Sequence, residues 1–269
     1  QSGYGQQYAQ SGYGQNYYAQ PQGAPTYQYV PQGTGAGAGA ATINTTMTYN
    51  YEEARRVSVT KVYGEMTIGI LVTAVVAVLG QITGAYYSFG MVGLIGLCVV
   101  QIALAVVLGM RVTKMKSATA RVMFYVYAAL MGFTLSSIFM VYDLGSIGVA
   151  LGVTAAFFFA LTMFGMTTKF NMLKAGPILM IGLIVLIISQ IVLAFVQVDG
   201  MTKIVCAIGL ILFAGMTIYD AQSTRALLTE YEAQGPEMVK KISILCALNL
   251  YLDFVNMFLY ILQLLGNRD

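Results

Sequence analysis

The sequence contains no histidine, which removes the commonest metal ligand and the side chain that usually changes charge near neutral pH. Hydrolases that rely on a Ser-His pair are excluded for the same reason. The three cysteines, Cys98, Cys206 and Cys246, lie inside apolar runs without a Cys-x-x-Cys spacing. Neither a zinc site nor a disulfide framework is therefore predicted. Any proton chemistry falls to carboxylates, tyrosines or lysines.

Charged residues are also scarce, at 9% of the 269 residues, compared with roughly 25% in a typical soluble domain. Apolar residues gather in seven runs, each close to the length that crosses a hydrocarbon core of about 30 Å as a helix. The sequence therefore predicts an all-α integral membrane protein with seven transmembrane helices and the lipid bilayer as its partner. The runs cover residues 64–84, 89–110, 122–142, 147–166, 176–196, 204–225 and 242–264.

The first 50 residues differ from the remainder of the chain. They are rich in Gln, Gly and Tyr, repeat SGYGQ at 2–6 and 11–15, and carry no charge. Such a segment cannot bury enough apolar surface to offset the entropy lost on ordering. It also lacks the basic start and apolar core of a secretory signal. We expect residues 1–50 to form a disordered cytoplasmic tail and residues 51–269 to form the transmembrane domain.

The 14 lysine and arginine residues are distributed unevenly between the predicted loops. Lys203 and Arg268 are alone on one side of the predicted membrane, and the other twelve precede the first helix or lie in alternate loops. Cytoplasmic loops of membrane proteins carry the excess of basic residues. The distribution therefore predicts a cytoplasmic N-terminus and an external C-terminus.

Two acidic residues, Asp220 in the sixth run and Asp253 in the seventh, lie where neither tail nor loop gives access to water. A charge at that depth is costly and points to function. If both helices reach the Gly235-Pro236 turn, the two carboxyls differ in depth by only about 5 Å and can meet. If the helices end at Arg225 and Lys241, the difference approaches 10 Å. A third carboxylate, Glu65, lies at the edge of the first run, within i,i+4 reach of Lys61.

The last helix also carries a polar stripe. At about 100° per residue, five polar positions fall within an arc of about 80°, and mainly apolar residues cover the remaining surface. This pattern favours a face that lines a wet pathway. Interhelical hydrogen bonds, worth about 0.6 kcal/mol each, are the alternative explanation. The stripe consists of Asp253 and the candidate pore-lining residues Asn249, Asn256, Tyr260 and Gln263.

Two carboxyls held close together in a low dielectric cannot both ionise easily, so the pair tends to share a proton. When deprotonated, Asp220 and Asp253 offer hard oxygen ligands that suit calcium. Arg111, at the end of the second run, is a candidate latch for one aspartate. The alternative is that Arg111 only sets the topology of the chain.

Several segments resemble the Bax inhibitor-1 family, also called the transmembrane Bax inhibitor motif proteins, and in particular its bacterial branch. The resemblance covers residues 50–269 and leaves out the tail. It is carried by GFTLSSIFMVY at 132–142, TTKF at 167–170, FAGMTIYDAQ at 213–222, LNLYLDFVNMFLYIL at 248–262 and GNRD at 266–269.

The resemblance implies a seven-helix bundle with the last helix at its centre, in a bacterial plasma membrane. It further implies a pH-sensitive calcium leak gated by paired aspartates that match Asp220 and Asp253, with Arg111 as the latch. Some members carry a glutamate in the second helix, where this chain has Val100-Gln101. That difference bears on the ion path and its selectivity.

Other functions remain open at this point. A non-conducting membrane adaptor or modulator is one alternative. An intramembrane aspartyl protease would share Tyr219-Asp220, but it needs Gly-x-Gly-Asp where this chain has Leu252-Asp253. A retinal protein is excluded because the last run contains no lysine for a Schiff base. We expect no enzyme activity, no cofactor other than calcium as a permeant or bound ion, and no nucleic acid partner.

Overall fold

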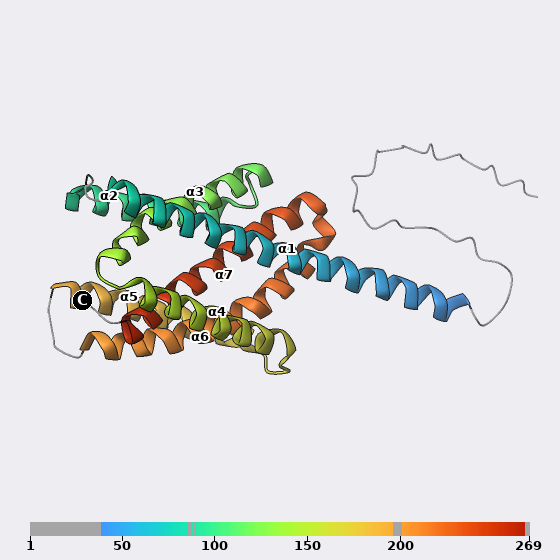
Figure 1. The fold of residues 1–269 in the computed structure, drawn as a ribbon. Helices are drawn as coiled ribbons and strands as arrows, with labels where there is room; N and C mark the ends of the chain where they lie inside the picture. Colours follow the sequence, from blue (N-terminus) through green and yellow to red (C-terminus); the bar gives the residue numbers. More distant parts are fainter. Residues whose placement is uncertain (1–38, 86–87, 89, 196–200, 267–269) are drawn as a thin grey trace, which may run out of the picture. The chain divides into compact units, whose positions relative to one another are not determined.

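The computed structural model describes residues 39–85, 88, 90–195 and 201–266 (Figure 1). Internal contacts divide the chain into residues 1–54 and 55–269, and the architecture below is that of the second unit. The first 38 residues of the expected tail lie outside the described residues. Residues 39–50 are helical and open α1, so the helix begins before the expected boundary at residue 50.

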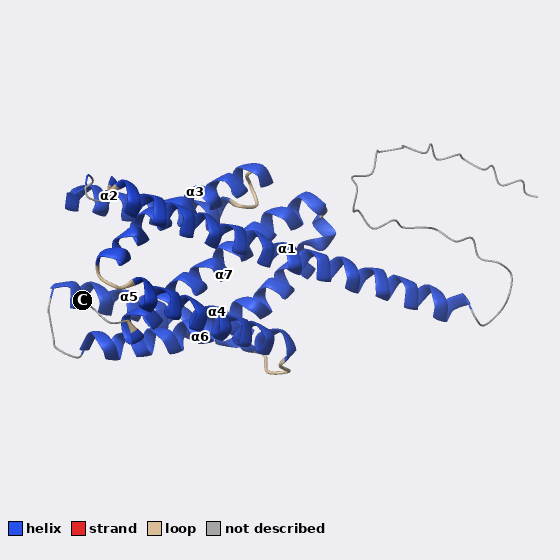
Figure 2. Cartoon of the chain, in the orientation of Figure 1, coloured by secondary structure: helices blue, strands red, loops and turns tan. Residues whose placement is uncertain are grey.

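The described residues form helices joined by short loops (Figure 2). Seven of these helices are long and apolar enough to cross a membrane, which confirms the predicted fold class. The long helices are α1 (Gly39–Thr83), α2 (Gly90–Arg111), α3 (Ser117–Leu135), α4 (Leu144–Thr167), α5 (Gly176–Phe195), α6 (Met201–Tyr231) and α7 (Pro236–Leu265). Short 3-10 segments are η2 (Ser136–Met140), η3 (Met172–Ala175) and η4 (Glu232–Gln234).

The last helix, α7, occupies the centre of the bundle. Within its most apolar stretch 72% of the residues are buried, whereas no other span exceeds 33%. Helices α3, α4 and α6 pack directly against it. In Figure 1 the red ribbon of α7 crosses the middle of the bundle, with α2 and α3 on one side and α4, α5 and α6 on the other. A helix enclosed in this way can keep polar groups away from lipid.

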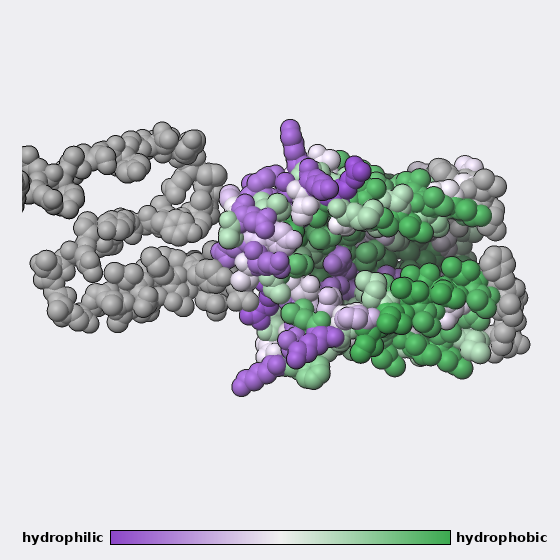
Figure 3. All heavy atoms as spheres, turned by 180° about the vertical axis from the view of Figure 1, so that it is seen from behind, coloured by the Kyte–Doolittle hydropathy of each residue, from purple (hydrophilic) through white to green (hydrophobic). Residues whose placement is uncertain are grey.

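Helices α6 and α7 form a tight hairpin. Gly235 joins them with a φ of 91°, a backbone conformation that favours glycine, and Pro236 takes the first position of α7. The α2–α3 loop, the α4–α5 loop and the Gly235 turn lie at one end of the bundle, which we call the turn end. Figure 3 shows hydrophilic side chains gathered at this end and an apolar surface over most of the remaining bundle. This polarity matches the charge distribution in the sequence.

The start of α7 holds the α2–α3 loop in place. The carboxylate of Glu237 accepts a hydrogen bond of 3.0 Å from the backbone N–H of Ser117, and Lys241 Nζ donates one of 3.3 Å to the carbonyl of Thr113. Glu237 thereby satisfies one of the free N–H groups at the beginning of α3, where a negative charge is favourable. Both ends of the α2–α3 loop, at Thr113 and Ser117, are therefore bonded to the central helix.

A partly buried acid joins α1 to α3. Glu65 accepts a hydrogen bond from the hydroxyl of Tyr125 and forms an ion pair with Arg121 at 2.6 Å. The sequence placed Lys61 within reach of Glu65, but the ion pair forms across the helix interface instead. Arg121 is half exposed, so this ion pair contributes little stability.

Candidate functional site

Asp220 and Asp253 meet in the interior of the α6–α7 hairpin. Helix α6 continues to Tyr231 and α7 begins at Pro236, so both helices reach the turn. This is the arrangement that places the two carboxyls at similar depth. The carboxyl of Asp220 lies within hydrogen-bonding reach of that of Asp253, and the two residues are 7% and 1% exposed.

The pair is enclosed by protein and has no basic partner among the described residues. The hydroxyl of Thr217 lies beside Asp253 while donating to its own helix at the carbonyl of Phe213, over 2.8 Å. Oδ2 of Asp253 is fully buried, and no donor in the described part of the chain bonds to it. Two carboxyls in contact without a cation need one shared proton, because two negative charges at that distance repel strongly.

Two further residues of the polar stripe contact α6. Tyr260 packs against Gly209 and Phe213 of α6, and Gln263 accepts a bond of 3.1 Å from the thiol of Cys206. Asn256 donates to the carbonyl of Leu252 in its own helix, and Asn249 is half-buried. Only Asp253 of the stripe is brought against Asp220. The pore-lining role of the other four stripe residues stays a prediction.

Arg111 ends α2 at the turn end and is exposed. In the described part of the chain it forms no ion pair with Asp220 or Asp253. Because the two carboxyls contact each other in this arrangement, neither needs the guanidinium as a counter-ion. The latch stays a prediction for a different arrangement of α2.

The opposite face of α7 carries a buried hydroxyl that the sequence did not single out. Tyr251 is fully buried, and its hydroxyl lies 2.7 Å from Oγ1 of Thr73 in α1. Thr73 also bonds to the carbonyl of Ala128 in α3, over 2.9 Å. The ring of Tyr251 meets that of Phe124 edge to face at 5.7 Å. One side of α7 thus binds α1 and α3, while the other side carries the carboxyl pair.

The second helix contains a neutral buried amide rather than an acid. Gln101 is 6% exposed, and its Nε2 donates a bond of 2.9 Å to Oγ1 of Thr134 in α3. An amide satisfies this hydroxyl without placing a charge in the bundle. The α2–α3 interface therefore adds no negative charge at this position.

Gln222, two residues after Asp220 in α6, binds the α4–α5 loop. Its Oε1 accepts from the backbone N–H of Met172 and its Nε2 donates to the carbonyl of Phe170, both at 2.8 Å. Arg225, one turn further on, donates to the carbonyl of Met166. The sequence placed Gln222 in the family segment but gave no indication of these partners.

We expect Gln222→Ala to loosen the α4–α5 loop without unfolding the bundle. The substitution removes two hydrogen bonds, each worth about 1 kcal/mol, and leaves the N–H of Met172 without its acceptor. Hydrogen exchange at Met172 should accelerate by roughly tenfold or more, since about 1.4 kcal/mol corresponds to a factor of ten. Gln222→Glu keeps the acceptor and should protect Met172. Equal exchange rates in wild type and Gln222→Ala would contradict this role.

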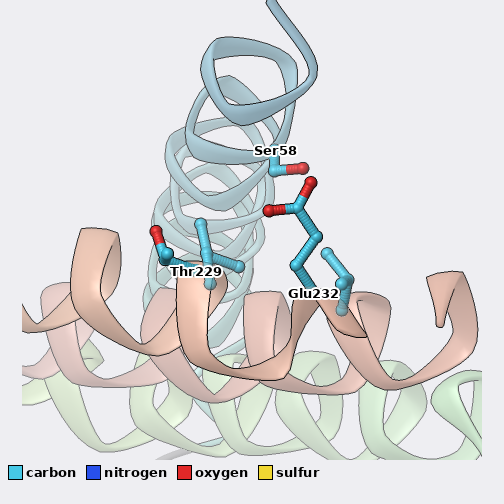
Figure 4. Close-up of a pocket in the computed structure, with 5 residues that line it drawn as sticks. Ser58, Thr229 and Glu232 are labelled. Atoms are coloured by element: carbon cyan, nitrogen blue, oxygen red, sulfur yellow. The ribbon is translucent and has the colours of Figure 1, made fainter. Parts of the chain in front are cut away.

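A small pocket lies at the turn end between α1, α6, η4 and α7. It is lined by Ser58, Leu228, Thr229, Glu232 and Val239. Figure 4 shows the carboxylate of Glu232 pointing toward the hydroxyl of Ser58. The pocket includes neither aspartate of the pair. It therefore gives no direct access to them.

The described residues contain no group of three or more histidine, cysteine or acidic side chains that could hold a metal ion. The paired carboxyls of Asp220 and Asp253 supply two oxygen-bearing side chains. Calcium takes six to eight oxygen ligands, including backbone carbonyls and water. The pair fits one side of a transient calcium site better than a complete structural one.

Comparison with known proteins gives a consistent result. A family model described as "Inhibitor of apoptosis-promoting Bax1" matches residues 55–269. The chain is 38% identical over 211 residues to the inner membrane protein YbhL of Escherichia coli K12, covering 77% of this chain and 90% of YbhL. It is also 35% identical over 211 residues to a protein of Borreliella burgdorferi, covering 77% of this chain and 90% of that protein. A protein of Rickettsia prowazekii is 32% identical over 222 residues, covering 81% and 92%.

Proposed function

This chain belongs to the Bax inhibitor-1 family of membrane proteins, and from that premise we propose that it is a pH-sensitive calcium leak channel gated by Asp220 and Asp253. The observation that carries the proposal is the contact between two buried carboxyls on neighbouring helices. Such a pair changes its total charge when it loses its shared proton.

The proposed gate works by repulsion between like charges. With one shared proton, the carboxyls attract each other and hold α6 against α7. When the proton leaves, two negative charges face each other in a medium of low dielectric, where their repulsion is much stronger than in water. The hairpin opens, and the ionised oxygens become ligands for a passing calcium ion. Calcium flux therefore rises as pH increases.

Arg111 provides the second part of the proposed switch. Once ionised, a carboxylate of the pair becomes a partner for the guanidinium, and α2 moves toward the core to bring the two together. Among the described residues Arg111 forms no ion pair, and in this proposal that arrangement is the closed, proton-sharing one. The proposed orientation in the bacterial plasma membrane places the turn end, and with it Arg111, in the cytoplasm.

The test is calcium flux into liposomes, measured over a range of pH for wild type and for Asp253→Asn. Wild-type flux should rise with pH, because deprotonation separates the pair. In the variant, a neutral amide faces Asp220, so loss of a proton no longer produces two facing negative charges. The variant should conduct at a rate that is independent of pH.

Asp143→Asn is the matched control because it also removes one carboxylate. Asp143 caps α4 by accepting from the backbone N–H of Ser146 at 2.9 Å, and asparagine can cap equally well. Hydrogen bonds from Ser146 hold the pKa of Asp143 below its usual value, so it stays ionised near neutral pH. The wild-type pH profile should persist in this control. An unchanged profile in Asp253→Asn would refute the proposed gate.

The same liposomes distinguish the alternative functions. Wild type that conducts no calcium at any pH, together with a protein partner recovered by crosslinking, would favour a membrane adaptor. Cleavage of a transmembrane peptide that is lost in Asp253→Asn would favour an intramembrane protease. We propose a non-enzymatic role because Asp253 is 1% exposed and gives a peptide bond no access to its carboxyl.

A further inference from the structure

Three buried polar atoms in the described residues have no hydrogen-bond partner: the Tyr63 hydroxyl, Oγ1 of Thr162 and Oδ2 of Asp253. They come from α1, α4 and α7. A buried polar group without a partner has lost its hydrogen bonds to water and gained none in the protein, so such groups are rare in stable proteins. Three such groups on helices that pack together call for a common explanation.

Thr162 departs from the behaviour of the other helical threonines. Threonine hydroxyls in the described helices commonly donate to the carbonyl four residues earlier, as in Thr73, Thr154 and Thr217. That bond is missing for Thr162, although its side chain is 4% exposed. Its hydroxyl is therefore available to a group outside its own helix.

Tyr63 differs from the other tyrosines of the core in the same way. The hydroxyls of Tyr251 and Tyr125 are bonded to Thr73 and Glu65. The Tyr63 hydroxyl lies beside Thr162, but the two do not meet the geometry of a direct hydrogen bond. Each hydroxyl therefore remains available to a third polar group.

The helix contacts place Tyr63 and Thr162 in the neighbourhood of the carboxyl pair. The ring centroids of Phe158 and Phe254 lie 5.6 Å apart, so α4 contacts α7 at the residue after Asp253. Thr162 lies one turn after Phe158 on the same face of α4. The carboxyls of Asp220 and Asp253 and the Cys246 thiol, on α6 and α7, are near enough to the Tyr63 hydroxyl to act on it electrostatically. The thiol lies against the hydroxyl of Thr224 and so has a partner already.

We propose that a buried water molecule bridges the Tyr63 hydroxyl, Oγ1 of Thr162 and Oδ2 of Asp253. Buried waters typically make about three hydrogen bonds to polar groups that otherwise lack partners, and three such atoms are present. The water accepts from the Tyr63 hydroxyl and donates to Oδ2 of Asp253 and to Oγ1 of Thr162. All three orphaned atoms are then satisfied at once.

The bridge makes Tyr63 and Thr162 positioning residues for the carboxyl pair. Through the water, α1 and α4 fix the orientation of the Asp253 carboxyl relative to Asp220. This positioning role rests on the proposed function of the pair, whereas the water site itself does not. Sequence reasoning had no means of finding it, because the three groups come from helices far apart along the chain.

The first test is a map of the wild-type protein at a resolution that shows ordered water. We expect a peak at roughly 2.7–3.2 Å from each of the three oxygens, which is hydrogen-bond distance. The peak should be lost in Tyr63→Phe, which removes one partner and keeps the ring. A dry interior, or a direct bond from Tyr63 to a protein group, would overturn the water site.

The second test is infrared spectroscopy of the protonated carboxyl in acid buffer, assigned as the band that Asp253→Asn removes. Tyr63→Phe and Thr162→Val should both shift this band, because each weakens the bonding of the water to Oδ2. Tyr251→Phe and Thr154→Val remove buried hydroxyls bonded elsewhere, and they should leave the band in place. If neither Tyr63→Phe nor Thr162→Val shifted the band, the positioning role would be refuted.

The two tests separate failure of the water site from failure of the channel. If the protein carries no calcium flux in liposomes but its map contains the water, the channel is refuted and the water site is not. If the flux depends on pH but the map shows a dry interior, the water site is refuted and the channel is not.

Discussion

Tyr251→Ala is expected to reduce the free energy of unfolding by about 3 kcal/mol, at the lower end of the roughly 3–5 kcal/mol seen when buried aromatics are truncated. The ring is fully buried and contacts those of Phe124 and Tyr127. Lipid is as apolar as the side chains themselves, so the loss comes from packing and not from transfer out of water. Unfolding in mixed micelles of SDS and a mild detergent measures the change.

Tyr251→Phe separates the ring from its hydroxyl. Thr73 keeps the carbonyls of Gly69 and Ala128 as acceptors when the phenolic oxygen is removed. The loss should therefore be about 0.6 kcal/mol, the average for interhelical hydrogen bonds in membrane proteins. If the two substitutions destabilised the protein equally, the hydroxyl rather than the packing of the ring would dominate at this position.

Gly132→Val is expected to separate α1 from α3. A side-chain carbon at Gly132 would lie 3.0 Å from Cα of Thr73 and from Cβ of Val76, and closer still to the carbonyl oxygen of Thr73. Backbone atoms cannot turn aside as side chains can, so the helices must move apart. Overpacking of this kind typically costs about 1–3 kcal/mol, and here the separation also strains the bonds of Thr73 to Ala128 and Tyr251.

Gly152→Val provides the control for helix propensity. Gly152 lies on an exposed face of α4, and a side chain there would meet no protein atom within 4 Å. Both substitutions place the same β-branched residue inside a helix, so they differ in their neighbours alone. The same micelle titration should show a large loss for Gly132→Val and little change for Gly152→Val. A reversed order would mean that α1 and α3 do not approach each other at Gly132.

The number of membrane helices could be predicted from the sequence, but their ends could not. Hydrophobicity marks the part of a helix that lies in lipid, so the last two runs were placed at 204–225 and 242–264. The helices themselves continue through polar residues to Tyr231 and begin again at Pro236. That extension decides between the two depths that the sequence left open for Asp220 and Asp253.

The carboxyl pair was accessible to sequence reasoning because each aspartate interrupts an apolar run. Its surroundings were not. The partner of Tyr251 is 178 residues away, and Gln222 bonds to backbone atoms 50 and 52 residues earlier. No local pattern encodes contacts of this kind. The unpaired Tyr63 and Thr162 likewise look like ordinary membrane-helix residues until the helices are packed together.

The ties from Glu237 and Lys241 to the α2–α3 loop also determine how α2 can move. They hold the end of α2 nearest Arg111 close to the central helix, so a tilt of α2 about this end displaces the Gly90 end most. At about 1.5 Å per residue α2 is about 33 Å long, and a tilt of about 5° displaces its far end by roughly 3 Å. If Arg111 binds an ionised carboxylate as proposed, a tilt of α2 that accompanies this binding would be largest at the opposite membrane surface.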